Sequence, residues 1–225
     1  MTPEDVFERY ADDYDRWFDE HSDEFEAELS RIKRICRDFA PQKNRNIPII
    51  EVGCGSGRFA KALGLKVGIE PSLSFCRIAR NRGVAAVRGR AEALPVKSRA
   101  CRAVLLITVI CFLKSPIPAL KEIFRILIPG GQVVVAFIER DGKIHKKYIL
   151  EKEKGRFLSH AKFYSEQEVC SFLKESGFII RDIDSKSGFC VVLAEKFNLI
   201  FLMEGIFFWM ILNESYFVTY MKLLA

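Results

Sequence analysis

The sequence contains no Cys-x-x-Cys pair, although seven of its 225 residues are cysteines. An odd number of cysteines, several of them inside apolar runs, is typical of buried free thiols rather than of a disulfide framework or a zinc site. We therefore expect no metal centre. The acidic N-terminus also lacks the apolar segment of a secretory signal. Together these absences predict a cytoplasmic protein.

Hydrophobic residues make up 49% of the chain and charged residues 28%, a composition that excludes wholesale disorder and allows a large core. The net charge of +6 is unevenly distributed, because residues 1–30 hold twelve acids and two arginines, a net of −10, which leaves +16 for the rest. A basic body favours anionic partners. No stripe of Arg or Lys interleaved with aromatic residues is present, so nucleic acid is not the favoured partner.

The order of the sequence patterns predicts an α/β fold with a doubly wound, mostly parallel, seven-stranded sheet. We divide the chain into an N-terminal helical cap over residues 1–46, a central domain over 47–197 and an apolar helical tail over 198–225. Residues 139–162 of the central domain form a polar insertion with the character of a lid. The expected strands are residues 47–52, 65–69, 84–87, 103–110, 132–138, 178–183 and 189–194.

Two helix starts carry specific capping signals. Thr2, Pro3 and Asp5 form a capping-box pattern with proline at the first helical position, and Ser165 with Glu168 repeats the capping box. These patterns predict helices that begin directly after Thr2 and Ser165.

The apolar tail has a composition of its own. Residues 199–221 are strongly apolar but contain Glu204 and Glu214. Their uninterrupted pieces are shorter than the ~20 apolar residues that a membrane-spanning helix needs, and a charge at the bilayer centre costs at least ~2.5 kcal/mol. We expect first a helix docked on the domain or on a partner, such as a second copy of the chain. A membrane-surface anchor is the second interpretation and a true span the third.

Three glycines, Gly53, Gly55 and Gly57, follow the first expected strand. A turn between strand and helix at the carboxyl edge of a parallel sheet binds nucleotides, because glycine lets a ligand reach the backbone and the helix N-terminus offers free N–H groups. The dinucleotide fingerprint would need a glycine where Arg58 stands, and no Gly-Lys-Ser/Thr follows for a phosphate loop. A plain tight turn is the alternative.

Glu70 ends the second expected strand, thirteen residues after Gly57. A carboxylate at this place accepts two hydrogen bonds from a ribose diol. The alternative is a solvated carboxylate at the end of a strand. Because the ends of neighbouring parallel strands meet at one edge of the sheet, the ligand role is favoured.

Four motifs, in order, resemble those of class I S-adenosylmethionine-dependent methyltransferases of the small-molecule "methyltransferase domain" type. Residues 51–57 resemble the first motif of this family, 68–72 its ribose-binding acid motif, 89–96 its adenine-side motif and 120–131 the helix before its fifth strand. Residues 10–17 resemble the helix that covers the cofactor in these enzymes. The resemblance implies a Rossmann-like methyltransferase fold with S-adenosylmethionine as cofactor.

The resemblance also implies roles for individual residues. Gly53 and Gly55 would leave room for the methionine part, Glu70 would hold the ribose hydroxyls, and Ala91 with Glu92 would frame the adenine. The implied cofactor-binding residues are Tyr14, Glu51, Gly53, Cys54, Gly55, Gly57, Glu70, Pro71, Ala91, Glu92 and Thr108.

Two points leave alternatives open within this resemblance. Tyr14 and Trp17 are expected neighbours of the cationic sulfonium, but helix packing explains them equally well. Arg90 stands where relatives often carry an acid, so the adenine contacts are less well supported than the fold.

Methyl transfer from a sulfonium is an in-line displacement, so placing the acceptor atom supplies much of the catalysis, and a base is needed only when the acceptor loses a proton. No catalytic residue is assigned, and Thr108 and His160 are the candidates. A structural hydrogen bond is the favoured alternative for His160. Cys111 has no paired base and is interpreted as a structural thiol.

The leading hypothesis is a methyltransferase that acts on a small-molecule or lipid-like acceptor. The alternative is a relative that binds the cofactor but has lost catalysis and serves as a partner subunit. A nicotinamide oxidoreductase is disfavoured by Arg58. A nucleic-acid methyltransferase is disfavoured because the Asn-Pro-Pro-aromatic motif is missing after the fourth expected strand.

Overall fold

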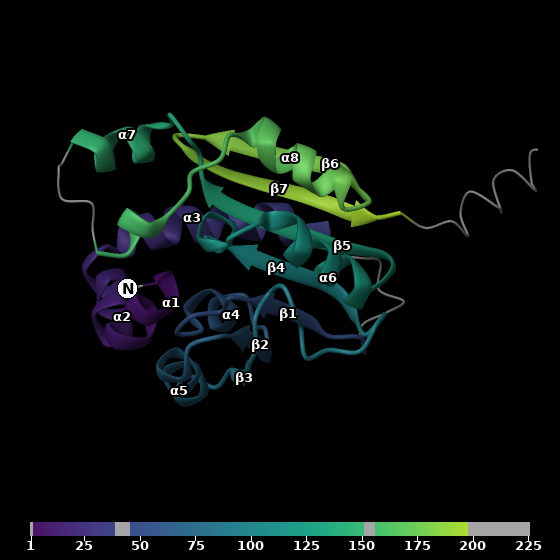
Figure 1. Cartoon of the computed structure of the whole chain (residues 1–225), viewed down its shortest axis with the longest axis horizontal. Helices are drawn as coiled ribbons and strands as arrows, with labels where there is room; N and C mark the ends of the chain where they lie inside the picture. Colours follow the sequence, from purple (N-terminus) through teal and green to yellow (C-terminus); the bar gives the residue numbers. More distant parts are fainter. Residues whose placement is uncertain (1, 39–45, 151–155, 198–225) are drawn as a thin grey trace, which may run out of the picture.

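The computed structural model describes residues 2–38, 46–150 and 156–197. Its centre is a seven-stranded sheet of order β3-β2-β1-β4-β5-β7-β6, with helices on both faces (Figure 1). The strands are β1 (Ile49–Val52), β2 (Val67–Glu70), β3 (Ala85–Arg88), β4 (Cys101–Ile107), β5 (Leu127–Ile138), β6 (Phe178–Lys186) and β7 (Phe189–Lys196). Neighbouring strands are parallel except β7, which is antiparallel to β5 and β6. The predicted fold class is confirmed.

The helices begin where the capping signals place them. The Thr2 hydroxyl accepts a hydrogen bond from the Asp5 N–H at 3.2 Å, and Ser165 does the same for Glu168 at 3.2 Å. The helices are α1 (Pro3–Arg9), α2 (Ala11–Glu20), α3 (Ser22–Ile35), α4 (Arg58–Ala62), α5 (Leu73–Asn81), α6 (Pro116–Ile126), α7 (Lys143–Leu150) and α8 (Glu166–Glu175). Short 3-10 turns are η1 (Cys36–Asp38), η3 (Ile110–Phe112) and η4 (Leu158–His160).

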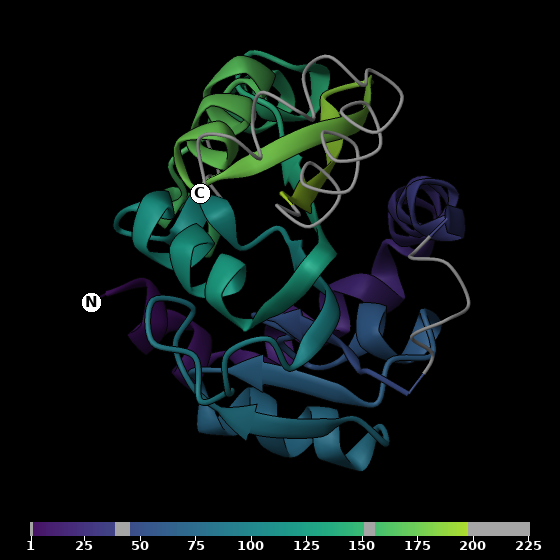
Figure 2. The ribbon, with the colours of Figure 1, turned by 90° about the vertical axis from the view of Figure 1, so that its right-hand side faces the viewer.

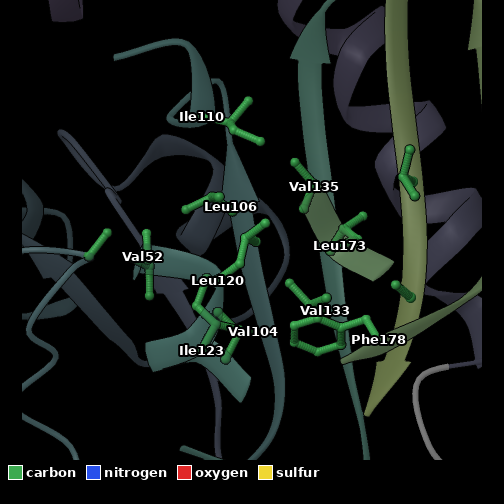
Figure 3. Packing of buried hydrophobic residues seen from close by; sticks show 14 of the residues in the cluster. Val52, Val104, Leu106, Ile110, Leu120, Ile123, Val133, Val135, Leu173 and Phe178 are labelled. Atoms are coloured by element: carbon green, nitrogen blue, oxygen red, sulfur yellow. The ribbon is translucent and has the colours of Figure 1, made fainter. Parts of the chain in front are cut away.

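The core follows from the two-residue period of the strands. In β4, Val104 and Leu106 point to one face of the sheet and Leu105 and Ile107 to the other, because successive strand side chains alternate. The first pair packs with α6 and α8 (Figure 3), and the second packs under α2 and α3. Figure 2 shows α6 and α8 on one side of the strands and α3 on the other. Each such buried side chain contributes about 1.5–3 kcal/mol of transfer free energy.

Most strand limits differ from the sequence prediction by a few residues, and two of these differences have a clear structural reason. The fourth strand ends at Ile107 instead of residue 110, because Thr108 takes a left-handed φ of 52° and Ile110 begins a 3-10 turn. The fifth begins at Leu127 instead of residue 132, because Leu127 pairs with Cys101 beyond a register shift. Hydrophobicity alone does not distinguish a buried turn from the end of a buried strand.

Several predictions concern residues outside the described ranges. The apolar tail over residues 198–225, with its proposed contact surface at 199–221, lies there, as do residues 151–155 of the polar insertion. The rest of that insertion contains α7 and η4. Within the ranges that the structure does describe, no helix has the length and apolarity needed to cross a membrane.

Candidate active site

All three glycines in the turn after β1 have backbone conformations that favour glycine. Gly53, Gly55 and Gly57 have φ angles of 71°, 51° and 78°, which side chains rarely tolerate. A Cβ on Gly53 would lie 2.3 Å from Val109 Cγ2, and one on Gly57 would lie 3.1 Å from Ala79 Cβ. A Cβ on Gly55 would meet nothing within 4 Å. Gly53 and Gly57 therefore permit close packing, whereas Gly55 borders open space.

Glu70 lies directly beside this turn. Its Oε2 accepts a hydrogen bond from the Gly55 N–H at 2.9 Å, and its Oε1 accepts one from the Ser72 N–H at 3.0 Å. Burial raises the pKa of Glu70 to about 7, against the opposing effect of these two hydrogen bonds. The carboxylate at the end of β2 and the glycine turn after β1 thus form one unit, as the sequence predicted.

A cavity of about 450 Å³ lies between the carboxyl ends of the strands and the N-terminal helices. Gly57 does not line it, because this glycine faces α5 instead. His160 lines the cavity together with the other ten residues that the sequence predicted to bind the cofactor. Those ten are Tyr14, Glu51, Gly53, Cys54, Gly55, Glu70, Pro71, Ala91, Glu92 and Thr108.

Glu51 is a buried carboxyl group with an unsatisfied atom in the cavity wall. Its side chain is 1% exposed, and its Oε2 has no hydrogen-bond partner in the described part of the chain. Burial raises the pKa of Glu51 well above its usual range, and the nearby Glu70 adds to this shift. An unpaired buried carboxyl group costs free energy, and a bound cationic or hydrogen-bonding group would offset that cost.

Aromatic rings from distant parts of the chain close one side of the cavity. Phe7 of α1 stacks on Phe157 with ring centroids 5.3 Å apart and meets Tyr14 and Phe112 edge-on at 5.5 and 4.9 Å. The ring centroid of Phe75 in α5 lies 5.5 Å from that of Tyr14. Phe7 and Phe75 were not predicted as cavity residues, because helical spacing alone suggests core packing.

The two aromatic residues proposed beside the sulfonium are separated by the structure. Tyr14 lines the cavity, as does Thr108. Burial raises the pKa of Tyr14, so the phenol stays neutral. Trp17 instead stacks on His21 with centroids 4.2 Å apart and is not among the cavity-lining residues. Helix packing is therefore the role that the structure gives Trp17.

The adenine-side loop is joined to α1 by an ion pair. Arg90 contacts the carboxylate of Glu4 in α1 and lies 3.6 Å from Glu92. The departure from the family pattern at Arg90 thus has a local role, because the arginine attaches the helical cap to the loop after β3.

The residues after β4 and before α8 form the remaining wall. Thr108 holds a φ of 52°, a strained conformation for a β-branched residue and one that often marks functional sites. The Lys162 N–H donates to the Cys111 carbonyl at 2.7 Å, so the segment of His160 lies against η3. Burial raises the pKa of Cys111 to about 12, which leaves no thiolate for nucleophilic attack. The structure thus agrees with a structural role for this thiol.

A charged cluster links α2 to the glycine turn. Asp15 accepts hydrogen bonds from Arg58 at 2.7 Å and from Arg82 at 2.8 Å, and Arg82 also donates to the Ser56 carbonyl. Burial would raise the pKa of Asp15, but the two arginines outweigh it and lower this pKa to about 2. No pattern in the sequence indicates this cluster, because its members are up to 67 positions apart in the chain.

Comparison with known proteins agrees with this geometry. Residues 50–135 match a family model described as a methyltransferase domain. An uncharacterized protein of Methanocaldococcus jannaschii is 33% identical over 210 residues, which is 85% of this chain and 98% of that protein. The crystal structure of a SAM-dependent methyltransferase of Thermotoga maritima, a possible histamine N-methyltransferase, has 32% identity and a TM-score of 0.76, covering 86% of this chain and 99% of that chain.

A more distant relative has a nucleic-acid substrate in its name. The tRNA U34 carboxymethyltransferase of Saccharophagus degradans is 28% identical over 137 residues, which is 55% of this chain and 41% of that protein. The chain belongs to the S-adenosylmethionine-dependent methyltransferases. It is an enzyme of this class, with S-adenosylmethionine as its cofactor.

The residues present fit this cofactor. Glu51, whose Oε2 is buried and unpaired in the described part of the chain, belongs to the wall of a cavity that would receive a cationic ligand, and the open space at Gly55 admits a ligand against the backbone. Glu70 lines the same cavity at the end of β2, beside the glycine turn. These three features come from β1, the turn after it and β2.

Proposed function

We propose that the enzyme transfers the methyl group to a small-molecule acceptor. The observation that carries this proposal is the extent of the cavity. Residues expected to hold the cofactor and residues expected to meet the acceptor line the same space of about 450 Å³. That volume falls in the range of about 300–1,000 Å³ typical of small-molecule pockets. Cap residues such as Phe7 and Tyr14 border it, so a large acceptor has limited access.

The relatives favour the same conclusion. The Thermotoga maritima protein, a possible histamine N-methyltransferase, matches nearly the whole of both chains. The tRNA-modifying relative matches little more than half of this chain and less than half of its own. A base of tRNA would also have to leave its stack and enter the cavity, which costs a few kcal/mol.

The roles of the residues follow from their places in the cavity wall. When bound, S-adenosylmethionine supplies a methyl group to which a lone pair of the acceptor forms the new bond, while the electrons of the broken carbon–sulfur bond stay on the sulfur. Glu70 and the backbone at Gly55 would hold the ribose and methionine parts, and the carboxyl group of Glu51 would lie in the wall near the cationic end. Thr108 and Tyr14 fix the wall beside the reacting atoms. His160, at the mouth, takes a proton from an acceptor that must lose one.

The proposal is tested by following labelled methyl groups. The full chain is incubated with methyl-labelled S-adenosylmethionine and either a metabolite filtrate or total tRNA from the same cell extract. We expect label in the filtrate, and label in tRNA alone would overturn the proposal. Gly55→Val serves as the inactive control, because its side chain would fill the open space at a φ of 51°. Its circular dichroism shows whether it has folded.

A further inference from the structure

Four lysine and arginine side chains line the cavity, and they fall into two pairs with different environments. Arg58 is neutralised by Asp15 and Asp19, at 2.7 and 2.8 Å. Arg90 is paired with Glu4 and Glu92, as described above. Lys114 and Lys162 make no ion pair with any carboxylate in the described ranges. The Lys162 Nζ lies 5.1 Å from the centroid of the Tyr164 ring, a contact that does not neutralise its charge, so both charges are available to a ligand.

The two unpaired lysines belong to the same part of the wall. Lys114 follows η3 directly, and the backbone of Lys162 is hydrogen-bonded to Cys111 within η3 at 2.7 Å. Phe112 and His160, each two positions before one of these lysines in the chain, also line the cavity. Lys114, Lys162 and His160 are all exposed, so this part of the wall is the solvent-facing mouth.

The carboxylates lie on the opposite side of the cavity. Glu51 and Glu70 come from β1 and β2, and both are buried. Glu4 and Glu92 complete the acidic lining, next to Arg90. No described carboxylate lines the cavity on the side formed after β4 and β5. One cavity thus has an acidic side that suits a cationic cofactor and a basic side that would repel one.

We propose that the methyl acceptor carries an anionic group, a carboxylate or a phosphate, that is bound by Lys114 and Lys162. The inference rests on the proposed small-molecule function and specifies its substrate class. A cationic acceptor would meet two unpaired lysines and the cofactor's own positive charge, whereas an anionic acceptor is attracted by all three. This substrate class differs from the amine in the name of the Thermotoga maritima relative.

A binding experiment tests the inference without turnover. The full chain, saturated with S-adenosylhomocysteine, is titrated with succinate and with inorganic phosphate by calorimetry. We expect at least one of them to bind. Lys114→Glu combined with Lys162→Glu should weaken that binding by about tenfold or more, the effect of losing one or more charge-assisted hydrogen bonds. Affinity for S-adenosylhomocysteine should change by less than about twofold, because neither lysine contacts the acidic side.

A matched control separates a local effect from one of net charge. Lys121→Glu with Lys174→Glu makes the same change in charge at exposed positions of α6 and α8 that do not line the cavity. This control should bind the anion as the unchanged protein does. Equal weakening in both double variants, or no binding of either anion to the unchanged protein, would overturn the inference.

A turnover experiment distinguishes this inference from the proposed function. Hydroxy- and amino-benzoates, the corresponding benzamides and the corresponding benzylamines share a ring and a nucleophile but differ in charge. We expect formation of S-adenosylhomocysteine to be fastest with the benzoates. Faster turnover of benzamides or benzylamines would overturn the anionic acceptor and leave the small-molecule function standing. Turnover of tRNA with no small-molecule turnover would overturn both.

Discussion

Asp15 and Asp184 are similar carboxylates in two different regions of the molecule. Each is held by two arginines, and their side chains are 17% and 14% exposed. The partners of Asp184, Arg31 and Arg34, both come from α3, so this cluster joins one helix to the edge strand β6. In both regions hydrogen bonds from the arginines lower the pKa of the aspartate.

The partners of Asp15 come from separate places. Arg58 begins α4, and Arg82 follows α5 and also donates to the backbone of Ser56 in the glycine turn. The pairing of an aspartate with two arginines therefore has two different effects. At the far edge of the sheet it holds α3 against β6, and beside the cavity it joins the N-terminal cap to the glycine turn. What an ion pair does depends on which elements its partners belong to.

The largest expected effect is a loss of cofactor affinity on substitution of Glu70, which belongs to the cavity region. Glu70→Ala should weaken S-adenosylmethionine binding by about 100-fold, because it removes a charged acceptor of hydrogen bonds and leaves the Gly55 N–H unpaired. Calorimetry measures the affinity. Glu122→Ala is the matched control, since Glu122 accepts the Leu94 N–H at 2.9 Å but does not line the cavity. Unchanged affinity in Glu70→Ala would contradict the ribose-binding role.

A smaller effect tests the comparison of the two aspartates directly. Asp15→Asn should weaken S-adenosylmethionine binding by about tenfold, because a weakened charge-assisted hydrogen bond no longer holds Arg82 against the glycine turn. Asp184→Asn should lower the melting temperature while affinity changes by less than about twofold. Calorimetry and thermal unfolding measure the two effects. Equal losses of affinity in both variants would show that Asp15 acts only through general stability.

The smallest expected effect is a dependence of stability on pH. Burial raises the pKa of Glu70 to about 7, above its value in the unfolded chain. The folded state therefore favours the protonated form of Glu70. The resulting contribution to the free energy of unfolding is complete below about pH 4.5 and is lost as the pH rises through 7. The lowered pKa values of Asp15 and Asp184 act below this window. Burial also raises the pKa of Glu28 in α3 to about 8, so this helix adds to the change between pH 5 and 8.

Thermal unfolding of the ligand-free chain measures this dependence. We expect a loss on the order of 1 kcal/mol from pH 5 to pH 8, about 2–4 °C in melting temperature for a chain of this size. Glu70→Gln should show a smaller loss, because its amide does not ionise. Identical pH profiles of the two proteins would mean that Glu70 does not titrate in this range.

Much of the fold was predictable because it depends on local patterns. Capping boxes at Thr2 and Ser165 and glycines after the first strand are contained within a few residues. Thr108 shows where this reasoning stops. Its apolar neighbours suggested a continuing strand, but the strand ends at Ile107, Thr108 takes a left-handed φ, and Val109 packs against Gly53.

The candidate site was predictable in part for the same reason. Residues in motifs, such as Glu70 and Ala91, were found together in one cavity wall. Phe7, Phe75 and the paired arginines were not found, because their roles require knowing which helices cover the carboxyl edge of the sheet. Gly57 belongs to the glycine motif but faces α5. The spacing of the motif does not show which of its glycines face the cavity.

The amino-acid sequence by itself determined the alternation of strands and helices, the glycine turn and the acid that ends the next strand, because each depends on neighbours in the chain. Only the tertiary structure decided that Asp15 holds the turn through Arg82 and that Lys114 and Lys162 line one cavity without an ion pair to any described carboxylate. Such contacts join positions far apart in the chain, and burial and charge act through space.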